Sequence, residues 1–79
     1  RLMIQVNRFS PPRAEVRGEI LRAYNESERL IKETERERIT AISRTTWWRL
    51  ERSGEVPRRK RVGGSAVWLL SDLLAWMQK

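Results

Sequence analysis

The chain has 79 residues, a formal net charge of +7, a pI of about 11.3, and neither cysteine nor histidine. A chain of this length forms one small domain, and the missing residue types exclude disulfides and the usual zinc sites. The charge favours a nucleic acid or another anionic partner. Residues 43–79 carry eight Lys/Arg against three Asp/Glu, whereas residues 1–42 carry nine against seven, so the positive excess lies in the C-terminal half.

Membrane insertion and secretion are not expected. The longest apolar run, residues 66–77, contains Asp72 and is shorter than the roughly 20 residues that span a bilayer. The apolar stretch at residues 2–6 is too short for a secretory signal and includes Gln5. We therefore expect a soluble cytoplasmic protein. Because cysteine and histidine are absent, we also expect no metal, and no other cofactor is expected.

A first helix is predicted from Pro12 to about Tyr24. Before it, residues 1–9 give a weak strand pattern through Ile4 and Val6, which Ser10-Pro11-Pro12 interrupts. Proline suits the first turn of a helix because its missing N–H has no partner there. Apolar residues at helical spacing form one stripe of this helix: Val16, Ile20, Ala23 and Tyr24.

A linker at residues 25–27 divides the chain. We expect residues 1–27 to form an arm and a helix, and residues 28–79 to form the binding domain. The apolar stripe of the first helix fits two roles equally well: packing on its own domain, or pairing with a second copy of the chain. Residues 1–25 are therefore a candidate segment for self-association.

A short strand and a short helix are predicted next. Residues 30–32 form a brief apolar step, and Thr34 begins the pattern of a capping box, which predicts a helix over residues 35–40. The alternating charges of residues 33–38 indicate a solvated helix face without a function of its own.

A second helix follows a turn at Ala41-Ile42. Ser43 is predicted to cap it, Trp47 and Leu50 to face inward, and Gly54 to end it in a left-handed conformation. The outer face then carries Arg44, Thr45, Trp48, Arg49 and Arg52. Adjacent tryptophans cannot both face inward, so Trp48 either packs at the edge of the domain or contacts the partner.

A basic β-hairpin comes next. Strands over residues 59–62 and 66–69 flank Gly63-Gly64-Ser65, a three-residue glycine loop typical of a hairpin. Residues 58–61 are four consecutive cations, and side chains alternate between the two faces of a strand, so two cations are expected on each face.

The last helix completes the order of elements. Ser71 is predicted to cap it, and its apolar side closes the core through Leu73, Leu74, Trp76 and Met77. The predicted order of elements is typical of a winged helix-turn-helix: helix, turn, helix, basic hairpin and closing helix. The predicted fold class is therefore mainly α with a small β-hairpin wing, extended at the N-terminus by one helix.

This fold class predicts binding of double-stranded DNA. The N-terminal half of the second helix enters the major groove, so Arg44 is the first candidate for base readout through guanine O6 and N7. Thr45 offers a methyl group to thymine or a hydroxyl to a phosphate. Trp48 and Arg49 are expected at sugar and phosphate, and the wing, residues 58–66, at phosphates or in the minor groove.

The expected DNA-binding residues lie on the helix at residues 43–52 and on the wing. They are Arg44, Thr45, Thr46, Trp48, Arg49, Arg52, Arg58, Arg59, Lys60, Arg61, Gly63, Gly64 and Ser65. The alternative for the helix arginines is a solvated surface, and for the wing a solubilising basic strand that protects the sheet edge. The glycines are expected to supply positive φ angles at the hairpin turn.

Three local motifs resemble the AlpA family of small phage and prophage regulators, which is related to the MerR and excisionase winged-helix proteins. They are Thr40-Ala41-Ile42-Ser43-Arg44-Thr45-Thr46-Trp47-Trp48-Arg49-Leu50, Gly54-Glu55-Val56-Pro57, and Trp68-Leu69-Leu70-Ser71-Asp72 with Trp76. The resemblance covers residues 28–79. It implies a transcriptional regulator or an excisionase of a mobile element in a bacterial host, with an integrase or RNA polymerase as a further partner.

The chain departs from the family pattern at three places. Arg36 stands where the family usually has an aliphatic residue, which implies either a short first helix or burial of the arginine stem alone. The hairpin is one residue shorter than usual. Trp48 replaces the common tyrosine and lacks its hydroxyl.

Other functions have less support in the sequence. A catalytic site is not expected, because the chain shows no nucleophile–base pair and no phosphate loop. A protein-interaction module that grips an acidic partner through Trp48 and the basic hairpin is the main alternative to DNA binding. An RNA-binding protein, in which Trp48 stacks on an unpaired base, is a third.

Overall fold

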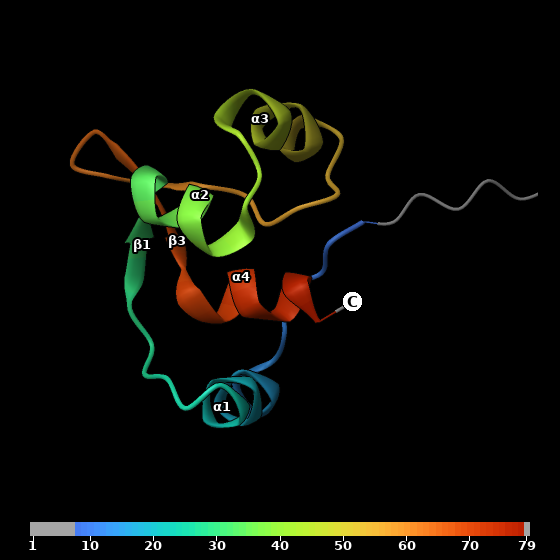
Figure 1. Ribbon diagram of the computed structural model, residues 1–79. Coiled ribbons are helices and arrows are strands. Elements are labelled where there is room, and N and C mark those ends of the chain that lie inside the picture. The colour runs from blue at the N-terminus through green and yellow to red at the C-terminus, as the bar shows by residue number, and fades with distance from the viewer. Residues whose placement is uncertain (1–7, 79) are drawn as a thin grey trace, which may run out of the picture.

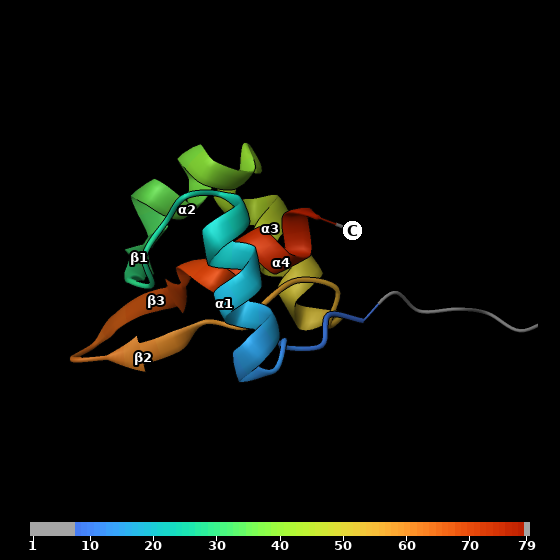
Figure 2. The ribbon, with the colours of Figure 1, turned by 90° about the horizontal axis from the view of Figure 1, so that it is seen from below.

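The computed structural model describes residues 8–78 and arranges them as four helices and three short strands. In chain order these are α1 (Ala14–Ala23), β1 (Leu30–Lys32), α2 (Glu33–Thr40), α3 (Arg44–Arg52), β2 (Lys60–Val62), β3 (Ser65–Leu69) and α4 (Leu70–Met77). Helix α4 lies in the middle, with α2 and α3 on one side and α1 on the other, and the hairpin projects from the body (Figures 1 and 2). The strand pattern through Ile4 and Val6 lies outside the described residues.

The sheet is antiparallel with the strand order β1-β3-β2. Gly63 and Gly64 have φ angles of +55° and +84°, and Val62 pairs directly with Ser65. The hairpin therefore turns over two glycines, and the prediction of a three-residue loop is wrong. Because both glycines adopt positive φ, as a type I′ turn requires, Ser65 is free to begin β3.

The core is built around tryptophans. Trp47 of α3 packs edge-on against Trp68 of β3 and Trp76 of α4, with ring centroids 6.2 and 5.2 Å apart. Ile31 and Leu73 are fully buried beside them. Aromatic pairs in this geometry add about 0.5–1.5 kcal/mol each beyond the area that they bury. The inward positions predicted for Trp47 and Leu50 are confirmed, since Leu50 packs on this cluster.

Arg36 of α2 is fully buried within that core. Its guanidinium lies 4.7 Å from the ring centroid of Trp47 and 5.8 Å from that of Trp68. It donates hydrogen bonds to the carboxylate of Glu33 and, at 2.6 Å, to the carbonyl of Ile42. The interpretation of residues 33–38 as a wholly solvated face is wrong, and so is burial of the stem alone, because the charged group itself is paired inside.

Helix α2 begins earlier than predicted. It starts at Glu33, directly after β1, with Lys32 at its N-cap and no side-chain cap. Thr34 therefore lies inside the first turn and not at the cap. The immediate step from strand to helix leaves no loop residue to serve as a cap, and Glu33 bonds to Arg36 instead.

Helix α4 also begins without the predicted serine cap. It starts at Leu70, so Ser71 lies in its first turn and is buried. Glu28 supplies the cap from a distance: its carboxylate accepts hydrogen bonds from the Ser71 backbone N–H at 3.1 Å and from the Ser71 hydroxyl at 2.6 Å. Met77, expected in the core, is 38% exposed because it lies at the end of the helix.

Helix α1 packs against α4 through part of its predicted stripe. Ile20 is buried in the core, whereas Val16 and Tyr24 remain 42% and 39% exposed. Arg17 turns inward instead and donates to Ser71 Oγ at 2.7 Å and to Asp72 Oδ1 at 2.6 Å. An ion pair thus occupies one position on the inner face of α1. The apolar pattern alone predicted an inner face with Val16 and Tyr24, which are exposed, and without Arg17.

Candidate nucleic-acid interface

Helices α2 and α3 form a helix-turn-helix with a tight connection. Ala41 adopts a left-handed conformation with φ of +60°, and Ser43 is the N-cap of α3, as predicted. The Ser43 hydroxyl accepts a hydrogen bond from the Thr46 backbone N–H at 3.3 Å and donates one to the Thr46 hydroxyl at 3.1 Å. The cap fixes the start of α3, and Gly54, with φ of +81°, ends the turn that follows it.

The outer face of α3 carries the predicted residues. Its exposed residues are Arg44, Thr45, Trp48, Arg49 and Arg52, and Thr46 is half-buried beside the cap. Trp48 is 50% exposed, and the Arg52 guanidinium lies 5.1 Å from its ring centroid. Trp48 therefore lies on the outer face of α3 and outside the core, and its contact with the partner stays a prediction.

The strand β2 and the tip of the wing are exposed, whereas Arg59 and Ala66 at its base are half-buried. Lys60, Arg61 and Val62 of β2 and the tip formed by residues 63–65 are all accessible to solvent. Arg61 pairs with Ala66 and Lys60 with Val67, so these two cations project from opposite faces of the hairpin.

Arg59 is held in an ion pair with Glu51 of α3. Its Nη2 and Nε donate to Oε1 of Glu51 at 2.8 and 3.1 Å, and its backbone N–H donates to Oε2 at 2.5 Å. The hydrogen bonds from its side chain to Glu51 raise the pKa of Arg59 above its ordinary value. The pair fastens the base of the wing to α3. Sequence reasoning missed Glu51, although a carboxylate one turn after Trp47 on the inward face was a signal that it needed a cation.

Replacing Arg59 with alanine should destabilise the protein. Glu51 is buried, so its carboxylate would lose its charged partner and keep only one backbone donor. We expect a loss of about 1–3 kcal/mol in the free energy of unfolding, measured by chemical denaturation. Arg61→Ala is the matched control, because Arg61 is exposed and should change stability by less than about 0.5 kcal/mol. Equal stabilities of the two variants would contradict the assigned pair.

An open groove of about 610 Å³ separates α3 from the wing. Arg44, Thr45 and Trp48 line one side, and Arg59 and Ala66 line the other. The groove brings the start of α3 and the base of the wing together, although they are well separated in sequence.

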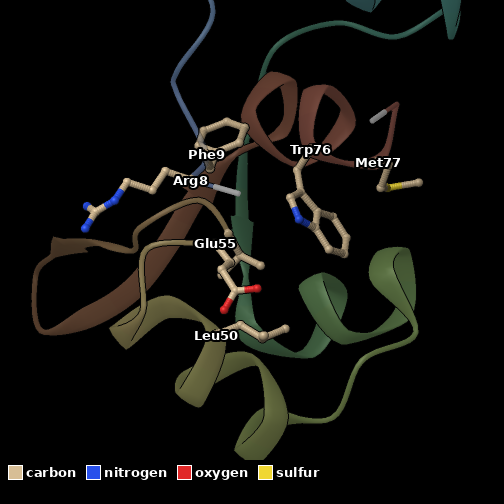
Figure 3. Close-up of a pocket in the computed structure, with 7 residues that line it drawn as sticks. Arg8, Phe9, Leu50, Glu55, Trp76 and Met77 are labelled. Carbon is tan, nitrogen blue, oxygen red and sulfur yellow. The ribbon is translucent and has the colours of Figure 1, made fainter. Parts of the chain in front are cut away.

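A second hollow, of about 580 Å³, lies at the far ends of α3 and α4. Leu50, Trp76 and Met77 line it together with Phe9, and Arg8 and Glu55 lie at its rim (Figure 3). The backbone N–H of Phe9 donates to the carbonyl of Gly54 at 2.9 Å, which fastens the N-terminal segment to the turn after α3. Sequence reasoning had singled out neither Arg8 nor Phe9.

None of the helices within residues 8–78 is long and apolar enough to cross a membrane.

The arrangement defines a winged helix-turn-helix: two helices across a tight turn, a three-stranded sheet, and a projecting hairpin beside the second helix. The family model described as prophage CP4-57 regulatory protein (AlpA) matches residues 29–79, and the chain belongs to this family of prophage regulatory proteins. The resemblance seen in the sequence is thereby confirmed. Comparison with curated proteins and with solved structures gives no significant match. The family match begins at the residue before β1, runs through α4, and does not include α1 or Arg8.

Proposed function

We propose that this phage regulator binds double-stranded DNA sequence-specifically, with α3 in the major groove and the wing on the phosphates or in the minor groove beside it. The observation that carries the proposal is the set of exposed cations on α3 and on the wing, the two elements that flank one open groove. Within residues 8–78 these cations make no ion pair: Arg44, Arg49 and Arg52 on α3, and Lys60 and Arg61 on the wing.

Arg44 is the proposed base-reading residue. It is the first residue of α3 and is exposed, so its side chain extends from the end of the helix that enters a major groove. A cation at a helix N-terminus is unfavourable for the isolated helix, because the partial charge there is also positive. An exposed arginine at this position is better explained by an anionic or acceptor-rich partner.

Arg59 has a positioning role in the proposal. Its charge is compensated by Glu51, so it holds the wing at a set distance from α3, and the free cations beside it supply the phosphate contacts. The proposed DNA-binding surface also includes residues of α3 and of the wing tip. On α3 they are Thr45, Thr46, Trp48 and Arg49, and at the wing tip they are Gly63, Gly64 and Ser65.

We further propose that the protein acts on transcription or on excision of the mobile element. Both roles need specific binding, and a single module of this size makes a small interface. Because one small interface gives limited affinity, we propose that the protein binds repeated or paired sites and self-associates through residues 1–25. We also propose contact with an integrase or RNA polymerase.

Selection of bound duplexes from a randomised DNA library, at roughly physiological salt, tests the proposal. Nonspecific phosphate binding is weak under those conditions, so a preference becomes visible. We expect an enriched motif, and its half-site spacing reports how many copies bind. No enrichment, together with tight binding of single-stranded RNA, would contradict the proposal and favour stacking on the exposed ring of Trp48.

A further inference from the structure

The hairpin has a second cationic face, turned away from α3. In the register of the sheet, Arg61 lies opposite Ala66, which lines the groove beside α3, whereas Lys60 lies opposite Val67. Successive side chains of a strand point to opposite faces, so Lys60 projects from the far side of the hairpin. Arg58 precedes β2 and lines the same hollow as Lys60.

Arg8 lies next to this second face. The hydrogen bond between Phe9 and Gly54 holds the N-terminal segment against the turn after α3. A methyl group placed on Gly54 would lie 3.6 Å from Nη1 of Arg8, so the arginine side chain passes over that turn. Its guanidinium extends away from Phe9 and from the apolar hollow (Figure 3).

Arg8, Arg58 and Lys60 line one open hollow of about 540 Å³. Arg17 and Asp72 line it too, but their charges are paired with each other at 2.6 Å. Within residues 8–78, the other three side chains make neither an ion pair nor a hydrogen bond, so three uncompensated positive charges share one concave surface. Like charges around one hollow repel one another, so an anionic ligand between them is favoured.

This second face is continuous with the surface that carries α3. Arg59 lines both the hollow and the groove beside α3, and a smaller depression joins Arg58 to Trp48 and Arg52. One line of cations therefore runs from α3 around the base of the wing to Arg8. A line of separate charges suits the evenly spaced phosphates of a nucleic-acid strand.

We propose that Arg8, Arg58 and Lys60 bind a second sugar-phosphate backbone of the same duplex, so that the wing lies between two backbones. The inference rests on the proposed function and extends it to a residue outside the family-matched part of the chain. The N-terminal segment then contributes a DNA contact of its own, separate from any part that it takes in self-association.

Phosphate-ethylation interference and a salt titration on the selected duplex test this proposal. For Arg8→Ala, and separately for Lys60→Ala, we expect interference to disappear at phosphates on one edge of the footprint. The slope of log K against log [salt] should become shallower by about 0.9 for each phosphate that the variant no longer neutralises. Arg22→Ala, another exposed arginine placed at the far end of α1, is the matched control and should behave like the wild type.

Two results would overturn the inference and leave the proposed function intact. One is an unchanged interference pattern and salt slope for Arg8→Ala while Arg44→Ala weakens the preferred site. The other is a lowered melting temperature of Arg8→Ala with an unchanged slope, since that indicates only a favourable contact with the C-terminal end of α3. If Arg44→Ala also binds every duplex as the wild type does, the inference and the proposed function both fall.

Discussion

Arg36→Ala is expected to lower the free energy of unfolding by about 3–5 kcal/mol, the range for removing a large side chain from a core and leaving a buried carbonyl unsatisfied. The substitution removes a guanidinium in contact with Trp47 and Trp68 and leaves a cavity between the rings. It also leaves the carbonyl of Ile42 without its donor. A domain below about 70–80 residues rarely has more than 3–5 kcal/mol of stability from its core, so much of this variant should be unfolded at 25 °C.

Arg36→Met separates the two parts of that loss. Methionine fills much of the same space but donates no hydrogen bond, so the Ile42 carbonyl stays unsatisfied at a cost of about 1–3 kcal/mol. Glu33 is partly exposed and can be solvated when its partner is removed. Urea denaturation should therefore rank the wild type above Arg36→Met and Arg36→Met above Arg36→Ala. A midpoint for Arg36→Ala equal to that of the wild type would show that the guanidinium is not buried among the tryptophans.

Arg44→Ala should weaken binding to the preferred duplex by about 1–3 kcal/mol, which corresponds to roughly 5- to 150-fold in Kd. If Arg44 donates two hydrogen bonds to a guanine, the loss is confined to sequences with that base pair, and preference relaxes at one position. Its stability should not fall, because Arg44 is exposed and lies at the helix end where a positive charge is unfavourable. Titration of the preferred duplex and of one with the base pair exchanged, by fluorescence anisotropy, measures the effect.

The comparison variant neutralises the free cations of the wing: Arg58, Lys60 and Arg61. Because these residues are proposed to bind phosphates, binding should weaken on every duplex alike and depend less on salt. Titration of both variants against the same duplexes therefore distinguishes base readout by α3 from phosphate binding by the wing. An equal loss on all sequences from both variants would remove the assignment of base readout to Arg44.

Local signals in the sequence predicted much of the fold. A hydroxyl at a helix start led to Ser43 as a cap, and apolar residues at helical spacing led to Trp47 as a core residue. A glycine-rich loop led to the hairpin, although the predicted loop is one residue too long. Each of these depends on neighbours within one or two turns of the chain, and that is why sequence alone was enough. The family motifs are short segments of the same kind.

The pairing of charges was decided by the tertiary structure. Glu28 caps α4 from 43 residues away, and Arg17 meets Asp72 across 55. In the sequence these residues look like solvated charges, because nothing local says which carboxylate or hydroxyl will lie beside them. The partner of Arg36, Glu33, is only one turn away, but the burial of Arg36 beside the tryptophans depends on the assembled core. Arg59 is similar: the run of four cations predicts a basic strand, but only the packing of the wing against α3 brings Glu51 to one member of the run. An ion pair requires both partners to be positioned, and for partners far apart in the chain that position exists only after the core has assembled.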